Sequence, residues 1–228
     1  MKAIVLFSGG IDSTTCLAMA IERFGAANVV PLSITYGQKH SKEIEAARKV
    51  LDFYHLKGLE LDLSKIFASS NCSLLSHSHE AIPEASYEEQ LKKADGKPVS
   101  TYVPFRNGLF LSCAASVALS HGCQYIYYGA HSDDAAGNAY PDCSKTFNDA
   151  MYTAIRVGSG LQLEVIAPFI ELTKADVVKK GLELCVPYEY TWSCYEGHEK
   201  ACGKCGTCID RQKAFAANGT VDPILYEE

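Results

Sequence analysis

Phe7-Ser8-Gly9-Gly10-Ile11-Asp12-Ser13-Thr14 is the stretch that decides the fold of this chain. The apolar run at residues 4–7 predicts a buried strand, and apolar residues spaced i, i+3, i+4 and i+7 from Leu17 predict a helix that begins at Asp12. Two glycines between a strand and a helix let the backbone approach an anion, which free N–H groups at the helix N-terminus would bind. The stretch therefore predicts a phosphate cradle.

The common nucleotide signatures are missing from this loop. It lacks G-x-G-x-x-G, and no lysine follows its glycines as G-x-x-x-x-G-K-[ST] requires. The pattern S-G-G-x-D-S instead resembles the PP-loop of the ATP pyrophosphatase superfamily. That resemblance implies that the loop grips the β- and γ-phosphates while ATP is split to AMP and pyrophosphate, and that Asp12 helps to hold Mg²⁺. An ordinary strand–turn–helix with Asp12 as a cap is the alternative.

Composition limits the classes of partner. The 228 residues include 21 basic and 27 acidic side chains, for a net charge of −6, and no dense Lys/Arg run. An extended nucleic-acid partner is therefore disfavoured, which counts against PP-loop enzymes that modify intact tRNA. No apolar stretch approaches the ~20 residues of a membrane span, and the N-terminus does not resemble a signal peptide. We expect no membrane partner, small-molecule substrates, and a reducing cytoplasm, with a homodimer as an open option.

Strand and helix patterns alternate through most of the chain. Strands are predicted at residues 4–7, 29–35, 59–63, 125–128 and 163–167, with helices between them, which favours an α/β fold with a doubly wound, mostly parallel sheet. We predict a catalytic domain at residues 1–190 and a zinc-binding segment at residues 191–228 packed on it. Residues 64–100, rich in serine and charge, read as a weakly structured insertion, and we hypothesise that it closes over the substrate.

Charged side chains near predicted strand ends are candidates for the site. Arg106 opens the helix expected over residues 108–121, and its planar fork suits a carboxylate or phosphate. Lys174 lies in the first helical turn, where the dipole disfavours a cation, so we favour a functional role. Asp142 lies in an irregular loop and could bind Mg²⁺ or the polar edge of a purine-like base. Solvated side chains and helix caps, including Asn107 as a cap, are the alternatives.

Four cysteines cluster near the C-terminus. Cys202, Cys205 and Cys208 are spaced C-x₂-C-x₂-C, with Cys194 upstream, and glycines between them free the backbone to turn. Four thiolates in a short segment are typical of a tetrahedral structural Zn²⁺ site. An iron–sulfur cluster is the alternative metal centre. Disulfides are disfavoured by the inferred compartment.

Both ends together resemble the 7-cyano-7-deazaguanine synthase (QueC) family. The matching segments are residues 7–17, 36–40, 140–143 (Tyr-Pro-Asp-Cys) and 172–174, and the four cysteines followed by Arg211. The resemblance implies an adenine nucleotide alpha hydrolase-like fold with a small zinc knuckle. One departure is Phe105, where the family usually has glycine. Its ring is expected either to reshape the pocket or to pack away from it.

The resemblance also implies a reaction. ATP would adenylate 7-carboxy-7-deazaguanine, ammonia would give the amide, and a second activation would give the nitrile used in queuosine biosynthesis. Asp142 would pair with the base, and Arg106 and Lys174 would act as electrostatic clamps. The nucleotide would contact Phe7, Ser8, Gly9, Gly10, Ile11, Asp12, Ser13, Thr14, Thr15, Cys16 and Leu17. The alternatives are another PP-loop synthetase, a relative that attaches the deazaguanine to a different acceptor, and a nucleotide-binding module without turnover.

Overall fold

A five-stranded parallel sheet forms the centre of the molecule. The computed structural model describes residues 1–95 and 97–227. The strands run in the order β3-β2-β1-β4-β5, and all four pairings are parallel. They are β1 (Ala3–Leu6), β2 (Val29–Thr35), β3 (Leu59–Asp62), β4 (Tyr125–Tyr127) and β5 (Glu164–Ile166). The predicted α/β fold and its five strands are confirmed. The chain leaves β1 first toward β2 and later returns to β4, so its direction reverses beside β1, where such sheets bind ligands.

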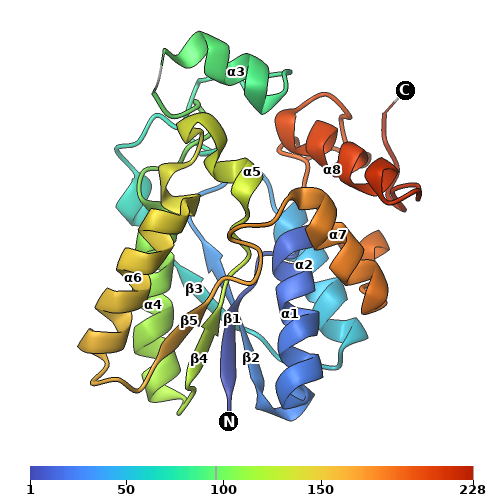
Figure 1. Cartoon of the computed structure of the whole chain (residues 1–228). Helices are drawn as coiled ribbons and strands as arrows, with labels where there is room; N and C mark the ends of the chain where they lie inside the picture. Colours follow the sequence, from blue (N-terminus) through green and yellow to red (C-terminus); the bar gives the residue numbers. More distant parts are fainter. Residues whose placement is uncertain (96, 228) are drawn as a thin grey trace.

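Helices cover both faces of the sheet (Figure 1). One face carries α1 (Ile11–Phe24), α2 (Lys42–Phe53) and α7 (Lys174–Glu183), and the other carries α4 (Arg106–Ser120) and α6 (Lys145–Gly158). Beyond the carboxyl ends of the strands lie α3 (Tyr87–Ala94), α5 (Ser132–Ala135) and α8 (Gly206–Ala217). Short 3₁₀ turns occupy Ala26–Asn28, Ser64–Phe67, Ala136–Asn138, Pro141–Cys143 and Tyr188–Tyr190.

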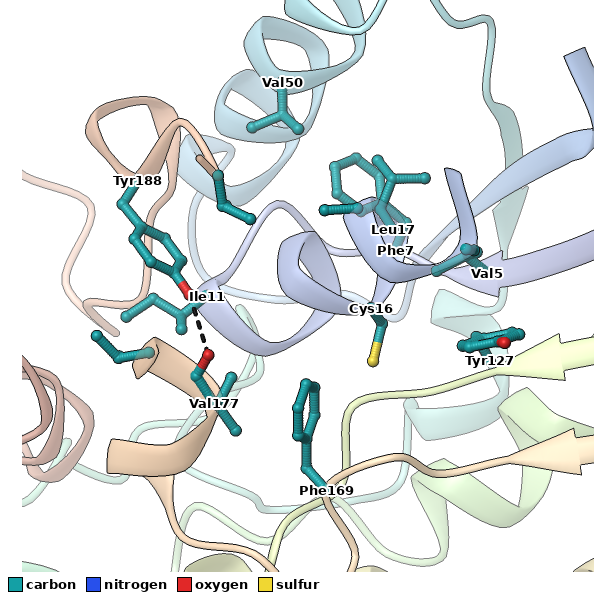
Figure 2. Packing of buried hydrophobic residues seen from close by; sticks show 14 of the residues in the cluster. Val5, Phe7, Ile11, Cys16, Leu17, Val50, Tyr127, Phe169, Val177 and Tyr188 are labelled. Atoms are coloured by element: carbon teal, nitrogen blue, oxygen red, sulfur yellow. Dashed lines mark hydrogen bonds between the residues drawn. The ribbon is translucent and has the colours of Figure 1, made fainter. Parts of the chain in front are cut away.

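Alternate residues of β1 supply two separate hydrophobic cores. Val5 faces α1 and α7, whereas Ile4 faces α4, as expected when successive side chains of a strand point to opposite faces. Figure 2 shows the first core, in which Cys16 of α1 lies near Phe169 and Tyr127, whereas Leu17 lies beside Phe7. A strand buried on both faces reads as a continuous apolar run, which is why β1 was recognisable in the sequence.

The insertion, described at residues 64–95 and 97–100, is mostly irregular apart from the 3₁₀ turn at Ser64–Phe67 and helix α3, but buried apolar residues anchor it. Leu75 is fully buried beside Phe67 and Tyr36, and these residues form a small core of their own. Helix α3 begins with a complete capping box, because Ser86 and Glu89 each bond the other's backbone N–H. The serine-rich composition concealed these apolar anchors.

The C-terminal segment is tied down by one buried arginine. Arg211 of α8 is fully buried and forms a bidentate ion pair with Asp222, with N–O distances of 2.6 and 2.9 Å. Its Nη1 also donates to Thr191 Oγ1 at 2.9 Å, and Nη2 donates to the Tyr188 carbonyl at 3.2 Å. Helix α8 packs against α7. The domain division near residue 190 stays a prediction.

None of the described helices combines the length and apolarity that a membrane crossing needs.

Candidate functional site

The predicted phosphate loop lies at the carboxyl end of β1. Gly9 has φ of +83°, and a side chain there would place Cβ 2.5 Å from the amide nitrogen of Ala47 in α2. The loop is cross-braced, because the Ser8 N–H donates to Ser13 Oγ at 3.2 Å and Thr14 Oγ1 donates to the Gly10 carbonyl at 2.7 Å. Only glycine fits position 9, where α2 packs directly on the loop.

A cavity of about 250 Å³ opens over this loop. It brings together side chains far apart in the sequence, including Arg106 and Lys174. Of the predicted nucleotide-binding stretch, five residues line it: Phe7, Ser8, Gly10, Asp12 and Ser13. The other six, Gly9, Ile11, Thr14, Thr15, Cys16 and Leu17, lie behind the lining residues. For Thr15, Cys16 and Leu17 the physical reason is that they occupy the fully buried face of α1.

One side of the cavity holds a charged group centred on Asp12. Its Oδ2 lies 2.5 Å from Lys174 Nζ, and its Oδ1 lies 3.8 Å from Nε2 of His131. The same His131 nitrogen lies 3.3 Å from Asp134 Oδ2. Burial raises the pKa of Asp12, but Lys174 and His131 outweigh that effect and hold the pKa below its usual value. The carboxylate is therefore ionised at neutral pH.

Asp12 has an oxygen to spare for a cation. Its Oδ1 is buried and accepts no hydrogen bond from the described residues. Carboxylate oxygens are the ligands that Mg²⁺ prefers, so this orphaned atom fits the predicted metal. Gly129, at the end of β4, permits the close approach, because a Cβ there would lie 2.8 Å from Cβ of Asp12. His131 was not among the predicted site residues, although its place after β4 was a usable signal.

The opposite side of the cavity is aromatic and carries Arg106. The guanidinium lies over the ring of Tyr36, 5.1 Å from its centroid, and 5.9 Å from that of Phe110. Its Nη1 donates to the Tyr36 hydroxyl at 3.3 Å. A guanidinium has five N–H donors, and this is its only hydrogen bond to the described residues. The remaining donors are available to an anion in the cavity.

Asp142 is 5% exposed and is not part of the cavity lining. Its Oδ2 accepts the backbone N–H of Asn107 at 2.8 Å, so it caps α4 from a distant loop. Asn107 is not the cap itself but the second helical residue. Burial raises the pKa of Asp142. The predicted contact between Asp142 and a base stays a prediction, and in this arrangement one carboxylate oxygen is already engaged.

The neighbouring Cys143 does line the cavity. Its sulfur lies 3.2 Å from Nδ2 of Asn107, and burial raises the pKa of the thiol well above its usual value. A thiol held in its neutral form is a poor nucleophile. We therefore assign it no covalent role.

Phe105 packs away from the cavity. It has φ of +54° and immediately precedes α4, in the left-handed region that glycine adopts most readily. Its ring stacks edge-on against Phe147 with centroids 5.7 Å apart, and it is 57% exposed. Of the two alternatives set by the sequence, the second is confirmed.

Three further carboxylates line the cavity: Glu43 of α2, Glu60 of β3 and Asp210 of α8. Burial raises the pKa of Glu43 and that of Asp210. The nearest opposite charges that lower these pKa values are Arg106 for Glu43 and Lys174 for Asp210. The sequence did not single out Glu43 or Asp210 as a site residue, because each lies in a helix and looks like ordinary surface charge.

The four predicted cysteine ligands converge. The sulfurs of Cys194, Cys202, Cys205 and Cys208 all lie within 4.8 Å of one another. Backbone N–H groups point at two of them, for example from Glu196 to Cys194 Sγ at 3.3 Å. Four buried thiols at this spacing, with N–H donors that would stabilise thiolates, fit a tetrahedral metal ion. This group, which we call the cysteine knuckle, could hold a metal.

The cysteine knuckle also brings residues to the cavity wall. Trp192, Ser193 and Tyr195 flank Cys194 and line the cavity. The backbone N–H of Trp192 donates to the Gly9 carbonyl at 3.0 Å, which joins the segment beside the knuckle directly to the phosphate loop. The Tyr195 hydroxyl lies 2.7 Å from that of Tyr87 in α3, so the insertion and the knuckle meet above the cavity. The sequence marked Cys194 as a ligand but not its neighbours as lining residues.

Comparison of the sequence with family models and with known proteins gives matches to one family. The family described as "Queuosine biosynthesis protein QueC" matches residues 2–219. The 7-cyano-7-deazaguanine synthase of Archaeoglobus fulgidus is 44% identical over 229 residues, covering 100% of this chain and 91% of that protein. The protein of the same name from Caldicellulosiruptor bescii is 41% identical over 227 residues, covering 100% and 98%.

A solved structure also resembles the fold. It is the U34-tRNA thiolase NcsA from Methanococcus maripaludis with its [4Fe-4S] cluster, with a TM-score of 0.53 and 14% identity. The match covers 96% of this chain and 66% of that one. At this identity the likeness concerns the fold alone.

Proposed function

Because this chain belongs to the QueC family of queuosine biosynthesis proteins, we propose that it is an ATP-dependent 7-cyano-7-deazaguanine synthase. Such a ligase converts 7-carboxy-7-deazaguanine and ammonia to 7-cyano-7-deazaguanine. The full-length relatives that carry this name support the proposal. Small-molecule substrates fit an enzyme of this family.

The observation that carries the proposal is the pairing of two cationic groups in one cavity. Lys174 stands beside the phosphate loop and Arg106 stands on the aromatic side. The reaction joins two anions, a triphosphate and a carboxylate, which repel each other in water. Fixed cations at each end would bring them together and stabilise the charge that develops on the leaving group.

The residues of the phosphate side have distinct roles in this proposal. The loop N–H groups and the Ser8 and Ser13 hydroxyls would hold the β- and γ-phosphates of ATP. Asp12 would hold Mg²⁺ through its free oxygen, and the ion would supply charge neutralisation to the departing pyrophosphate. Lys174 would be kept in place by Asp12 and would face the same charge. His131 is a positioning residue, because it packs against Asp12 and Asp134.

The chemistry proceeds in two activations. An oxygen of the substrate carboxylate attacks the α-phosphorus, and pyrophosphate leaves. Ammonia then attacks the activated carbonyl, loses a proton and displaces AMP to form the amide. The amide oxygen then attacks the α-phosphorus of a second ATP and a second pyrophosphate leaves, and loss of AMP and of both amide protons gives the nitrile. Arg106 would hold the carboxylate during the first attack. Asp142 fixes the N-terminus of α4, and its predicted contact with the base is carried forward as part of the proposal.

The remaining expectations belong to this proposal as well. The knuckle metal is proposed to be Zn²⁺ rather than an iron–sulfur cluster, because the four sulfurs lie within 4.8 Å of one another, a spacing that suits a single tetrahedral ion with metal–sulfur bonds of about 2.3 Å. A location in the cytoplasm is carried forward as an expectation. Independence from nucleic acid and a homodimeric assembly are carried forward as expectations.

One incubation tests the function. The zinc-loaded protein is mixed with ATP, Mg²⁺, ammonia and 7-carboxy-7-deazaguanine, and pyrophosphate, amide and nitrile are followed by mass spectrometry. We expect pyrophosphate release and nitrile formation with transient amide. Formation of neither product by the metal-loaded protein would exclude the proposed reaction, and accumulation of the amide without nitrile would show that the second activation does not take place.

A further inference from the structure

Glu43 is a carboxylate in the cavity that the phosphate chemistry does not use. It is the second residue of α2, and its side chain makes no hydrogen bond and no ion pair with the described residues. Burial raises the pKa of this carboxyl group. Glu43 is partly buried and lines the cavity, so a carboxylate without a protein partner at this place is available to a ligand that supplies hydrogen-bond donors.

The surroundings of Glu43 suit a flat aromatic ligand. Tyr36, Phe110 and Ile44 line the same part of the cavity and offer apolar faces. Arg106 and Glu43 both line this cavity, and the positive charge of Arg106 lowers the pKa of Glu43, but no ion pair joins the two side chains in the described residues. A cation and an anion that line one cavity without pairing can bind two different ends of one ligand.

We propose that Glu43 accepts hydrogen bonds from the N1–H and 2-amino groups of the deazaguanine ring and so selects a guanine-type base. This inference rests on the proposed function. The two donors are adjacent and parallel, and they match the two oxygens of a carboxylate. Adenine has no N–H at the corresponding ring position, so the same contact would exclude the base of ATP from the substrate position.

The other acidic residues of the site are less suited to this role. Asp142 already accepts the Asn107 N–H and does not line the cavity. Asp210 lines it, but on the side where Lys174 lowers its pKa, near the phosphate loop. Glu43 shares its side with Arg106, which would hold the 7-carboxylate at the far end of the same ring.

The test compares two ligands on three proteins. Calorimetry measures the affinity of 7-carboxy-7-deazaguanine and of the same compound without its 2-amino group. The proteins are wild type, Glu43→Gln, and Glu45→Gln as the matched control. Glu45 lies in the same helical turn but is exposed and outside the cavity. MgATP affinity is measured for each, and thermal unfolding verifies that each variant is folded.

We expect wild type to prefer the 2-amino compound by tenfold or more, as charge-assisted hydrogen bonds of about 1.5–3 kcal/mol predict. Glu43→Gln should bind 7-carboxy-7-deazaguanine about 10- to 100-fold more weakly and should lose most of the preference between the two ligands. Its MgATP affinity should match that of wild type, and Glu45→Gln should behave as wild type throughout.

The outcomes separate two kinds of failure. If wild type does not bind 7-carboxy-7-deazaguanine at all, the proposed function is wrong. If wild type binds and discriminates but Glu43→Gln does so equally well, the function stands and Glu43 is not the reader of the base. Equal loss of MgATP affinity in Glu43→Gln would also overturn the inference, because Glu43 would then support the phosphate loop instead.

Discussion

The carboxylate of Asp12 and the ammonium group of Lys174 lie 2.5 Å apart and tie the N-terminus of α1 to that of α7. Both helix ends point into the cavity, where their dipoles favour anions. A lysine at such an end would otherwise be repelled, so Asp12 compensates locally while leaving the ammonium beside the phosphate loop. The backbone N–H of Lys174 donates to Asp133 at 2.8 Å, which fixes the helix end further.

Replacing Lys174 with alanine should slow pyrophosphate release by about 10²- to 10³-fold, the usual cost of losing one preorganised electrostatic contact in a transition state. Lys179→Ala, in the exposed part of the same helix, is the matched control and should retain full activity. Both rates are measured with a pyrophosphate-coupled assay. Full activity of Lys174→Ala would remove this lysine from the mechanism.

Removal of the knuckle metal should weaken both stability and nucleotide binding. A metal that binds only the folded state at about 1,000 times its dissociation constant contributes about 4 kcal/mol. For a chain of this size that corresponds to a fall in Tm of about 8–16 °C. Loss of the metal also releases Trp192 from the phosphate loop, so MgATP affinity should fall with it.

Metal analysis and Co²⁺ substitution identify the ion. One zinc per chain, and the visible bands of tetrahedral Co²⁺–thiolate in the substituted protein, are the expected results. Broad visible absorption in freshly purified protein would instead indicate an iron–sulfur cluster. Unchanged Tm after complete chelation would contradict a structural metal.

Glu43→Gln should stabilise the ligand-free protein at neutral pH. Burial raises the folded-state pKa of Glu43 above the ordinary value of 4.5, so ionisation at higher pH costs the folded state free energy. The stability contribution of the protonated group is fully present below pH 4.5 and is lost as pH rises through the raised pKa. The advantage of the variant should therefore appear above that range and vanish below it.

Chemical denaturation of both proteins at pH 4 and pH 7 checks this sign. Glu45→Gln again serves as the control and should show no such pH-dependent gain. A variant that is less stable than wild type at pH 7 would mean that Glu43 has a protein partner in solution.

Two variants at position 105 can measure the free-energy cost of its left-handed backbone conformation. Phe105→Ala loses the contact with Phe147 and keeps the unfavourable φ, whereas Phe105→Gly loses the contact but relieves the backbone. Phe105→Gly should therefore be about 1 kcal/mol more stable than Phe105→Ala. Both variants should retain catalytic activity, because the ring lies outside the cavity. Denaturant unfolding measures the difference, and an order of stability reversed in favour of alanine would contradict it.

The insertion at residues 64–100 should become protected when ligands bind. Tyr87 of α3 lines the cavity and meets Tyr195, so a bound nucleotide and base should hold the insertion closed. Limited proteolysis with and without MgATP and 7-carboxy-7-deazaguanine measures the rate of cleavage there. Equal rates in both conditions would show that the insertion does not act as a lid.

Much of the fold could be predicted from the sequence because local patterns determine it. The strands β1 and β2 are apolar runs that continue over several residues, and the phosphate loop is a contiguous motif. The sequence did not predict helices α3 and α8, for two different reasons. The capping box of α3 lay in a serine-rich stretch, and α8 begins among the glycines and cysteines of the knuckle.

The site was predictable only in part. Asp12, Arg106 and Lys174 stand out by residue type beside a strand or helix end, and they do share one cavity. Asp142 also stood out, but its partner Asn107 is 35 residues away, so its capping role depends on tertiary structure. Glu43 was inconspicuous because the residues that share the cavity with it, such as Tyr36 and Arg106, come from other parts of the sequence. When the role of a side chain depends on residues that are distant in the sequence, the residues next to it in the sequence cannot predict that role.

The hydrogen bond from the Trp192 N–H to the Gly9 carbonyl has a consequence for how the protein is made. Gly9 leaves the ribosome well before Trp192 and the cysteines that follow it. The phosphate loop can form with its strand and helix while translation continues, but the part of the cavity lining that contains Trp192 has not yet been synthesised. A nascent chain that ends before Trp192 should therefore not bind nucleotide. Metal binding should follow the folding of the phosphate loop and not nucleate it.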